Sequence, residues 1–87
     1  METQILLYIE DDQELVDLIG PHLVVEGFEV KHFTNASSGF EFAQSTKPDL
    51  VLLDILLPDE NGLDVLKKFK TNTDLSEIPV IITTVEG

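Results

Sequence analysis

The sequence predicts one α/β domain, a parallel sheet with strand order 2-1-3-4 that is covered by helices on both faces in three layers. Short apolar runs alternate with segments of helical periodicity along the 87 residues, in the order βαβαβαβ. Strands joined by helices run parallel with right-handed crossovers. The runs at 5–9 and 49–54 hold few polar residues, as expected for strands that are buried on both sides.

The first strand, 5–9, leads into a predicted helix over 13–26. Asp12 is expected to cap the start of this helix and Gly27 to end it. Pro21 lies inside the helix and is expected to bend it, because proline has no N–H to donate. The apolar residues that follow the helical period, and that we expect to face the core, are Leu15, Leu18, Ile19, Leu23 and Val24.

The middle of the chain predicts an edge strand, a helix and a central strand. Residues 28–33 alternate between apolar and polar side chains, which indicates a half-buried strand at an edge of the sheet. A weaker helical pattern covers 35–46, with Phe40 and Ala43 as expected core contacts. The run at 49–54 follows and is predicted to be the central strand.

A turn at 58–62 (PDENG) precedes the last predicted helix, 63–70, and a polar loop leads to a fourth strand at 79–84. The expected core contacts of this helix are Leu63, Leu66 and Phe69. No repeat or linker is visible, so we expect residues 1–87 to form a single domain.

Composition excludes several classes of function. Seventeen acidic residues against five lysines give a net charge of −12, which repels nucleic acids and anionic membranes. The absence of cysteine excludes disulfides and thiolate metal sites. We expect a cytoplasmic protein, because neither a signal peptide nor a stretch of transmembrane length is visible. His22 and His32 are expected to be ordinary histidines rather than ligands or phosphodonors.

Acidic residues follow the first and third predicted strands, whose carboxyl ends meet at one edge of the sheet, at the point where the chain reverses direction. Glu10, Asp11 and Asp54 are therefore expected to converge there, with Asp54 opening into an acidic cleft. Carboxylates this close repel, so either one is protonated or a cation joins them, and oxygen ligands favour Mg²⁺. Alternatively, Glu10 and Asp11 stabilise the start of a helix. We expect Asp12 to be a cap rather than a ligand.

Three segments, ILLYIEDD, KPDLVLLDILLPDENG and IPVIITT, together resemble the receiver domain of bacterial two-component response regulators. The first matches the family's opening strand and acidic pair. The second matches its phosphoacceptor strand, with Pro58 four residues and Gly62 eight residues after Asp54. The third matches its fourth strand, which ends in a threonine. The resemblance spans the whole chain and implies a CheY-like, flavodoxin-like fold.

The resemblance implies a phosphoacceptor module rather than an enzyme. Asp54 would take a phosphoryl group from a phosphohistidine of a sensor histidine kinase or phosphotransfer protein. Asp11, Asp54 and the backbone carbonyl of Leu56 would bind Mg²⁺ directly, and Glu10 mainly through water. Thr84 would donate a hydrogen bond to the phosphoryl group.

Thr84 is a better match to the family's switch residue than Thr83, which alternation directs to the other face of the sheet. The sequence ends soon after it, without the fourth helix, fifth strand and fifth helix that the family carries. The family's phosphate-pairing lysine lies on that fifth strand. One helix would then cover four strands, so we expect exposed apolar side chains on the third and fourth strands, and a homodimer or larger assembly that buries them.

Two functional classes therefore stay open. One is a phosphorylated signalling module, and the other is a phosphorylation-independent interaction or assembly module that retains the acidic pocket. A metal-dependent phosphatase that uses Asp54 as nucleophile is a third, weaker match, because Leu56 stands where such enzymes place a second aspartate.

Overall fold

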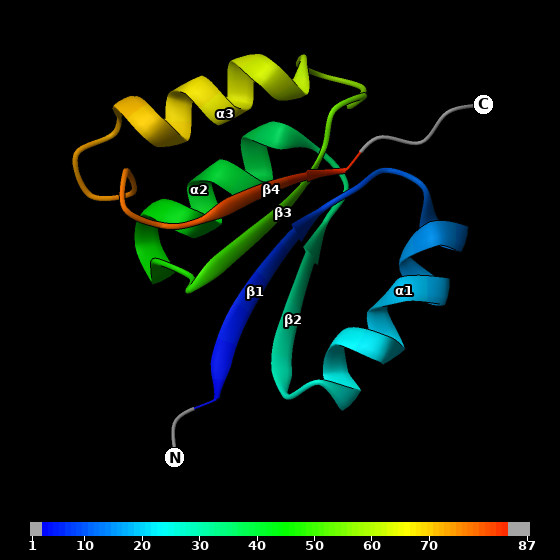
Figure 1. The fold of residues 1–87 in the computed structure, drawn as a ribbon. Helices are drawn as coiled ribbons and strands as arrows, with labels where there is room; N and C mark the ends of the chain where they lie inside the picture. The colour runs from blue at the N-terminus through cyan, green and yellow to red at the C-terminus, as the bar shows by residue number, and fades with distance from the viewer. Residues whose placement is uncertain (1–2, 84–87) are drawn as a thin grey trace.

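The structure, a computed structural model, describes residues 3–83 and has the predicted order of elements (Figure 1). The strands are β1 (Gln4–Ile9), β2 (Phe28–Phe33), β3 (Leu50–Asp54) and β4 (Val80–Thr83), and the helices are α1 (Gln13–Val25), α2 (Ala36–Thr46) and α3 (Gly62–Thr71). Each described boundary lies within one residue of the prediction. The predicted end of the fourth strand, Thr84, lies outside the described residues.

All strand pairs are parallel and their order is β2-β1-β3-β4, as predicted. β2 is an edge strand, and β1 and β3 lie side by side with Ile9 opposite Leu53. This register places the residues that follow Ile9 next to Asp54, at the carboxyl edge of the sheet. The connections leave β1 and β3 in opposite directions, so this edge is the topological switch point.

The helices cover the two faces of the sheet unequally (Figure 1). α2 and α3 pack on one face over a continuous core of buried residues: Leu7, Ile9, Ala36, Ala43, Val51, Leu53, Val65, Phe69 and Leu75. Within residues 3–83, α1 alone covers the other face, where the buried residues are Leu6, Tyr8 and Val16. Ile81 of β4 is 51% exposed on that face, which confirms the expected exposure of the fourth strand. The expected exposure of the third strand is wrong, because Leu50 and Leu52 are partly buried against the α1-face core.

α1 begins and ends where predicted, but part of its predicted core face is wrong. Asp12 caps it, because Oδ1 accepts the N–H groups of Glu14 (3.0 Å) and Leu15 (3.3 Å). Gly27 follows its end at a φ of +102°, a conformation that favours glycine. Leu18 (65%) and Val24 (58%) are exposed, whereas the residues against the sheet are Val16, Ile19 and Leu23. These three are spaced at i, i+3 and i+7, one helical stripe.

Part of the predicted core face of α3 is wrong as well. Leu63 is 54% exposed, whereas Val65 and Phe69 are buried and Leu66 packs beside them. Gly62, Val65 and Phe69 are the residues of α3 that face the sheet, again at i, i+3 and i+7. The expected contacts of α2, Phe40 and Ala43, are confirmed. Among the helices of residues 3–83, none combines the length and apolar character that a bilayer crossing requires.

Candidate functional site

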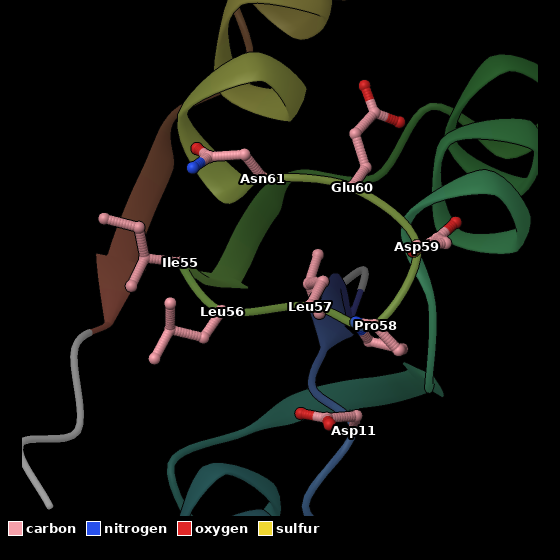
Figure 2. A pocket seen from close by; sticks show the side chains of 8 residues that line it. All are labelled: Asp11, Ile55, Leu56, Leu57, Pro58, Asp59, Glu60 and Asn61. Carbon is pink, nitrogen blue, oxygen red and sulfur yellow. The ribbon is translucent and has the colours of Figure 1, made fainter.

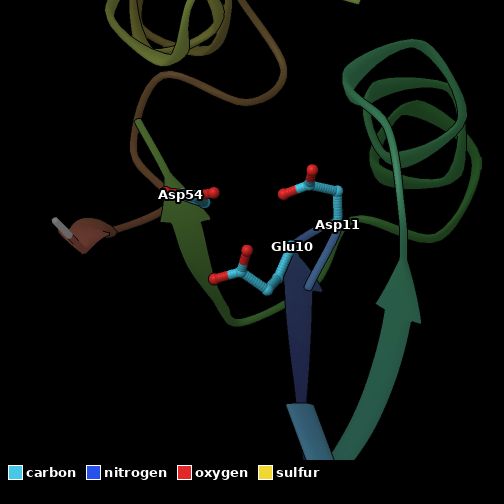
Figure 3. Close-up of side chains that lie close together, drawn as sticks. All are labelled: Glu10, Asp11 and Asp54. Atoms are coloured by element: carbon cyan, nitrogen blue, oxygen red, sulfur yellow. The ribbon is translucent and has the colours of Figure 1, made fainter. Parts of the chain in front are cut away.

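Three carboxylates meet at the switch point, as the sequence predicts. Glu10 and Asp11 follow β1, and Asp54 ends β3. One oxygen from each of the three lies within 4.8 Å of the others, and Figure 3 shows their side chains directed toward one another. We call Glu10, Asp11 and Asp54 the acidic cluster. Such a group of oxygen ligands suits a hard cation such as Mg²⁺.

The prediction that Asp54 opens into a cleft is wrong, because only 6% of Asp54 is exposed. Glu10 is buried as well, and Asp11 is the exposed member of the cluster. The β3–α3 loop (residues 55–61) begins directly after Asp54. Asp11 and this loop line a pocket of about 490 Å³ (Figure 2).

Burial sets the proton affinity of Glu10. Its carboxylate loses solvent and lies beside the carboxylate of Asp54, which together raise the pKa of Glu10 from 4.5 to about 7. One oxygen, Oε2, accepts the N–H of Asp12 at 3.3 Å. The other, Oε1, has no hydrogen-bond partner among the described residues. A buried carboxylate in this state needs either a proton or a cation, the two alternatives that the sequence leaves open.

The β3–α3 loop orients Asp54. The Leu56 N–H donates to Oδ1 of Asp54 at 3.2 Å, and Leu56 pairs with Asn61 across the loop. The Gly62 N–H closes the loop by donating to the Ile55 carbonyl at 2.8 Å. A Cβ on Gly62 would come within 2.7 Å of the Asp54 carbonyl oxygen, so only glycine fits here.

Two residues beside the cluster, His32 and Tyr8, have environments that sequence reasoning missed. His32 Nε2 lies 2.7 Å from the Glu10 carbonyl oxygen, which only accepts, so Nε2 is the protonated ring nitrogen. His32 is thus a satisfied histidine, as expected, and it holds the backbone of Glu10. The Tyr8 hydroxyl is buried without a partner among residues 3–83, and burial with the nearby charge of Glu10 raises its pKa to about 12. Nothing in the sequence signals the contact of His32 or the burial of the Tyr8 hydroxyl.

Of the two threonines at the end of the predicted fourth strand, the structure describes Thr83 only. Thr83 lies opposite Asp54 in the register, so the two share a face of the sheet and the expectation that Thr83 points to the other face is wrong. Its Oγ1 donates to the Leu53 carbonyl oxygen at 3.4 Å. Thr84, the predicted switch residue, lies outside the described residues. Asp12 is a helix cap and is not part of the acidic cluster, as expected.

Known proteins share this sequence pattern. A family model of the response regulator receiver domain matches residues 6–87. The DNA-binding dual master transcriptional regulator RpaA of Synechocystis sp. is 30% identical over 82 residues, which are 94% of this chain and 34% of that protein. The polar-differentiation response regulator DivK of Brucella anthropi is 33% identical over 79 residues, 91% of this chain and 64% of that protein. This chain thus spans about a third of the length of the first regulators it matches.

Solved structures agree with the sequence comparison. The N-terminal domain of a response regulator receiver protein from Methanoculleus marisnigri superposes with a TM-score of 0.89 at 28% identity, over 98% of this chain and 69% of that one. The signal receiver domain of a putative LuxO repressor protein from Vibrio parahaemolyticus gives 0.88 at 31% identity, over 99% and 65%. The fold, the strand order and the family match agree, and the chain belongs to the response regulator receiver domain family of two-component systems.

Proposed function

We propose that this chain is a phosphoacceptor of a two-component phosphorelay and that Asp54 is the residue that takes the phosphoryl group. The convergence of Asp54 with Glu10 and Asp11 at the switch point carries the proposal. Family membership supports it, because receiver domains are signalling modules.

The acidic cluster fits Mg²⁺. Its donors are oxygen atoms only, and Glu10 contributes a buried oxygen that has no partner among the described residues. We propose that Asp11, Asp54 and the carbonyl of Leu56 hold the ion directly and that Glu10 acts mainly through water. When bound, the ion supplies the positive charge that lets an anionic carboxylate meet an anionic phosphoryl group.

The reaction is a transfer between two side chains. A carboxylate oxygen of Asp54 bonds to the phosphorus of a phosphohistidine while the P–N bond breaks, and the leaving imidazole nitrogen keeps the electron pair and takes a proton from solvent. The Leu56 N–H holds Oδ1 of Asp54, which fixes the orientation of the carboxylate. Thr84 is the proposed hydrogen-bond donor to the phosphoryl oxygen.

We propose that the partner is a sensor histidine kinase or a phosphotransfer protein, whose histidine reaches the pocket lined by Asp11 and the β3–α3 loop. The net charge of −12 argues against direct binding to nucleic acid or to an anionic membrane. We place the protein in the cytoplasm, where such partners present their phosphohistidine, and propose that it acts on no substrate other than the phosphodonor.

A small phosphodonor tests the proposal directly. The chain is incubated with Mg²⁺ and acetyl phosphate, and its mass is measured. We expect the mass gain of one phosphoryl group, stable in acid and labile in base, in the wild type and in Asp74→Asn, whose carboxylate is exposed and distant from the cluster in sequence. Asp54→Asn should gain none. An equal gain in Asp54→Asn, or turnover of phosphate esters, would contradict the proposal.

A second candidate function, an assembly module that needs no phosphorylation, is favoured by the sparsely covered face of the sheet. Ile81 of β4 is exposed there. Within residues 3–83, no strand pairs with the outer edge of β4. An exposed apolar edge strand is a template for pairing with a second copy, so we propose a homodimer through this face.

The oligomeric state tests this second candidate. Light scattering at micromolar concentration should give a dimer for the wild type and a monomer for Ile81→Lys. Leu63→Lys adds the same charge on α3, at a residue that is 54% exposed, and should remain a dimer. A monomeric wild type that unfolds cooperatively would refute the homodimer.

A further inference from the structure

Asp59, in the middle of the β3–α3 loop, binds an element far from it in the sequence. Its Oδ1 accepts the Ala36 N–H at 2.9 Å, and its Oδ2 accepts the N–H and the hydroxyl of Ser37, each at 3.1 Å. These donors are the first residues of α2. Figure 2 shows Asp59 beside this helix. The Ala36 N–H, with the Ser37 donors, holds the pKa of Asp59 below its ordinary value. The loop is thus tied to the N-terminus of α2 by a charged group.

α2 has its own cap as well. Oδ1 of Asn35 accepts the Ser38 N–H at 2.9 Å, which is the usual contact of an N-cap residue. Asn35 and Asp59 therefore satisfy different N–H groups of one helix start. Only Asp59 connects that start to another part of the chain, so the two residues differ in what their loss would disturb.

The loop that Asp59 holds also shapes the acidic cluster. Leu56 donates to Asp54 and pairs with Asn61, and Gly62 closes the loop onto Ile55. These contacts fix the two ends of the loop to each other, but none of them joins it to α2. The Glu60 carboxylate binds Lys68 of α3, 2.9 Å away, which is again close in sequence.

We propose that Asp59 is a positioning residue: by anchoring the β3–α3 loop to α2 it sets the place of the Leu56 carbonyl and of the pocket wall that faces Asp11. The inference rests on the proposed Mg²⁺ site. A carboxylate that orients a ligand from outside the coordination sphere changes metal affinity without touching the ion. The packed core under α2 supplies the rigid support, because Ala36 and Ala43 are buried in it.

Asn35→Ala provides a matched control. It removes one capping contact from the same helix start but leaves the loop tied. We expect Asp59→Ala and Asn35→Ala to lower thermal stability to a similar extent. Asp59→Ala should weaken Mg²⁺ binding by roughly tenfold, the scale that loss of an outer partner of a metal ligand produces. Asn35→Ala should leave the affinity unchanged, and Asp59→Asn, which keeps an acceptor oxygen, should recover most of it.

Two measurements test the inference. Calorimetric titration with MgCl₂ gives the affinity, and hydrogen exchange gives the protection of the Gly62 N–H, which should fall in Asp59→Ala and not in Asn35→Ala. Equal Mg²⁺ affinity in Asp59→Ala and wild type would overturn the inference while leaving the proposed function intact. A wild type that binds no Mg²⁺ would overturn the proposed function. In that case unchanged Gly62 protection in Asp59→Ala would show that Asp59 does not anchor the loop either.

Discussion

The two faces of the sheet differ in packing and in chemistry. The α2/α3 face holds a continuous core, and Leu57 of the β3–α3 loop packs against it. The α1 face has a smaller core and carries exposed Ile81 and the unpartnered hydroxyl of Tyr8. By alternation along the strands, Glu10 follows Tyr8 and Asp54 follows Leu52 on this second face. The well-packed face therefore supports the loop, and the sparsely covered face carries the buried carboxylates.

The largest expected effect is the difference in unfolding free energy between a mutation in the α2/α3 core and one on the exposed side of α1. Phe69 is buried on the α2/α3 face and meets Phe40 edge to face, with ring centroids 5.2 Å apart. Phe69→Ala should lower the free energy of unfolding by about 3–5 kcal/mol, because it leaves a cavity. Leu18→Ala on α1 should change it by less than about 0.5 kcal/mol, because Leu18 is exposed. Urea unfolding measures both, and similar losses would show that Leu18 is buried in solution.

Glu10 should make the stability of the metal-free chain depend on pH. The folded pKa of about 7 lies above the ordinary 4.5, so between these values the folded chain binds more protons than the unfolded chain. The contribution of Glu10 is therefore fully present below about pH 4.5 and is lost as pH rises through 7, by up to about 3 kcal/mol.

Glu10→Gln removes this dependence, and Glu14→Gln, at an exposed position of α1, is the control. Urea unfolding without divalent ions, from about pH 5 to about pH 8, should show wild type and Glu14→Gln losing stability relative to Glu10→Gln. If the free energy of unfolding varied with pH in the same way for all three proteins, burial would not raise the pKa of Glu10.

Replacing a glycine by alanine should have opposite effects on stability at the end of the β3–α3 loop and inside α1. Gly62→Ala should cost about 1–3 kcal/mol, because its Cβ would press on the backbone of Asp54 and Ile55. Gly20→Ala lies inside α1, where a Cβ meets nothing within 4 Å, and should stabilise the chain by up to about 1 kcal/mol. Thermal unfolding measures both changes. A Gly62→Ala protein as stable as wild type would mean that the loop can move away.

The smallest effect should come from Tyr8→Phe. The mutation removes a buried hydroxyl that has no partner among the described residues and keeps the ring against α1. We expect no loss of stability, or a gain of about 1 kcal/mol, because an unsatisfied buried group costs free energy. A loss above about 1 kcal/mol in urea unfolding would show that the hydroxyl is bonded in solution.

The sequence predicted the elements and their order well, because buried strands and helix caps leave local signals. The apolar run before Asp54 and the cap at Asp12 are examples. It was wrong about Leu18 and Leu63, because each helix carries apolar residues on more than one side. Periodicity alone does not show which of these apolar sides of a helix packs against the sheet.

The candidate site was predicted in its members but not in its environment. Strand order alone brings Glu10, Asp11 and Asp54 together, and the structure confirms that they meet. The tie from Asp59 to α2 depends on how the β3–α3 loop folds, and the burial of Asp54 depends on the packing around the end of β3. Such contacts join residues that are far apart in sequence, so no local pattern reports them.

A Mg²⁺ titration of the metal-free chain tests the central claim, that the three carboxylates form one cation site, most directly. Calorimetry in two buffers of different ionisation enthalpy gives the stoichiometry and the protons released. We predict one ion per chain, about half a proton released at pH 7 because the pKa of Glu10 is about 7, and almost none at about pH 9. Asp54→Asn and Asp11→Asn should abolish binding, and Asp74→Asn should not. Undiminished binding in Asp54→Asn, or no binding in the wild type, would contradict the account.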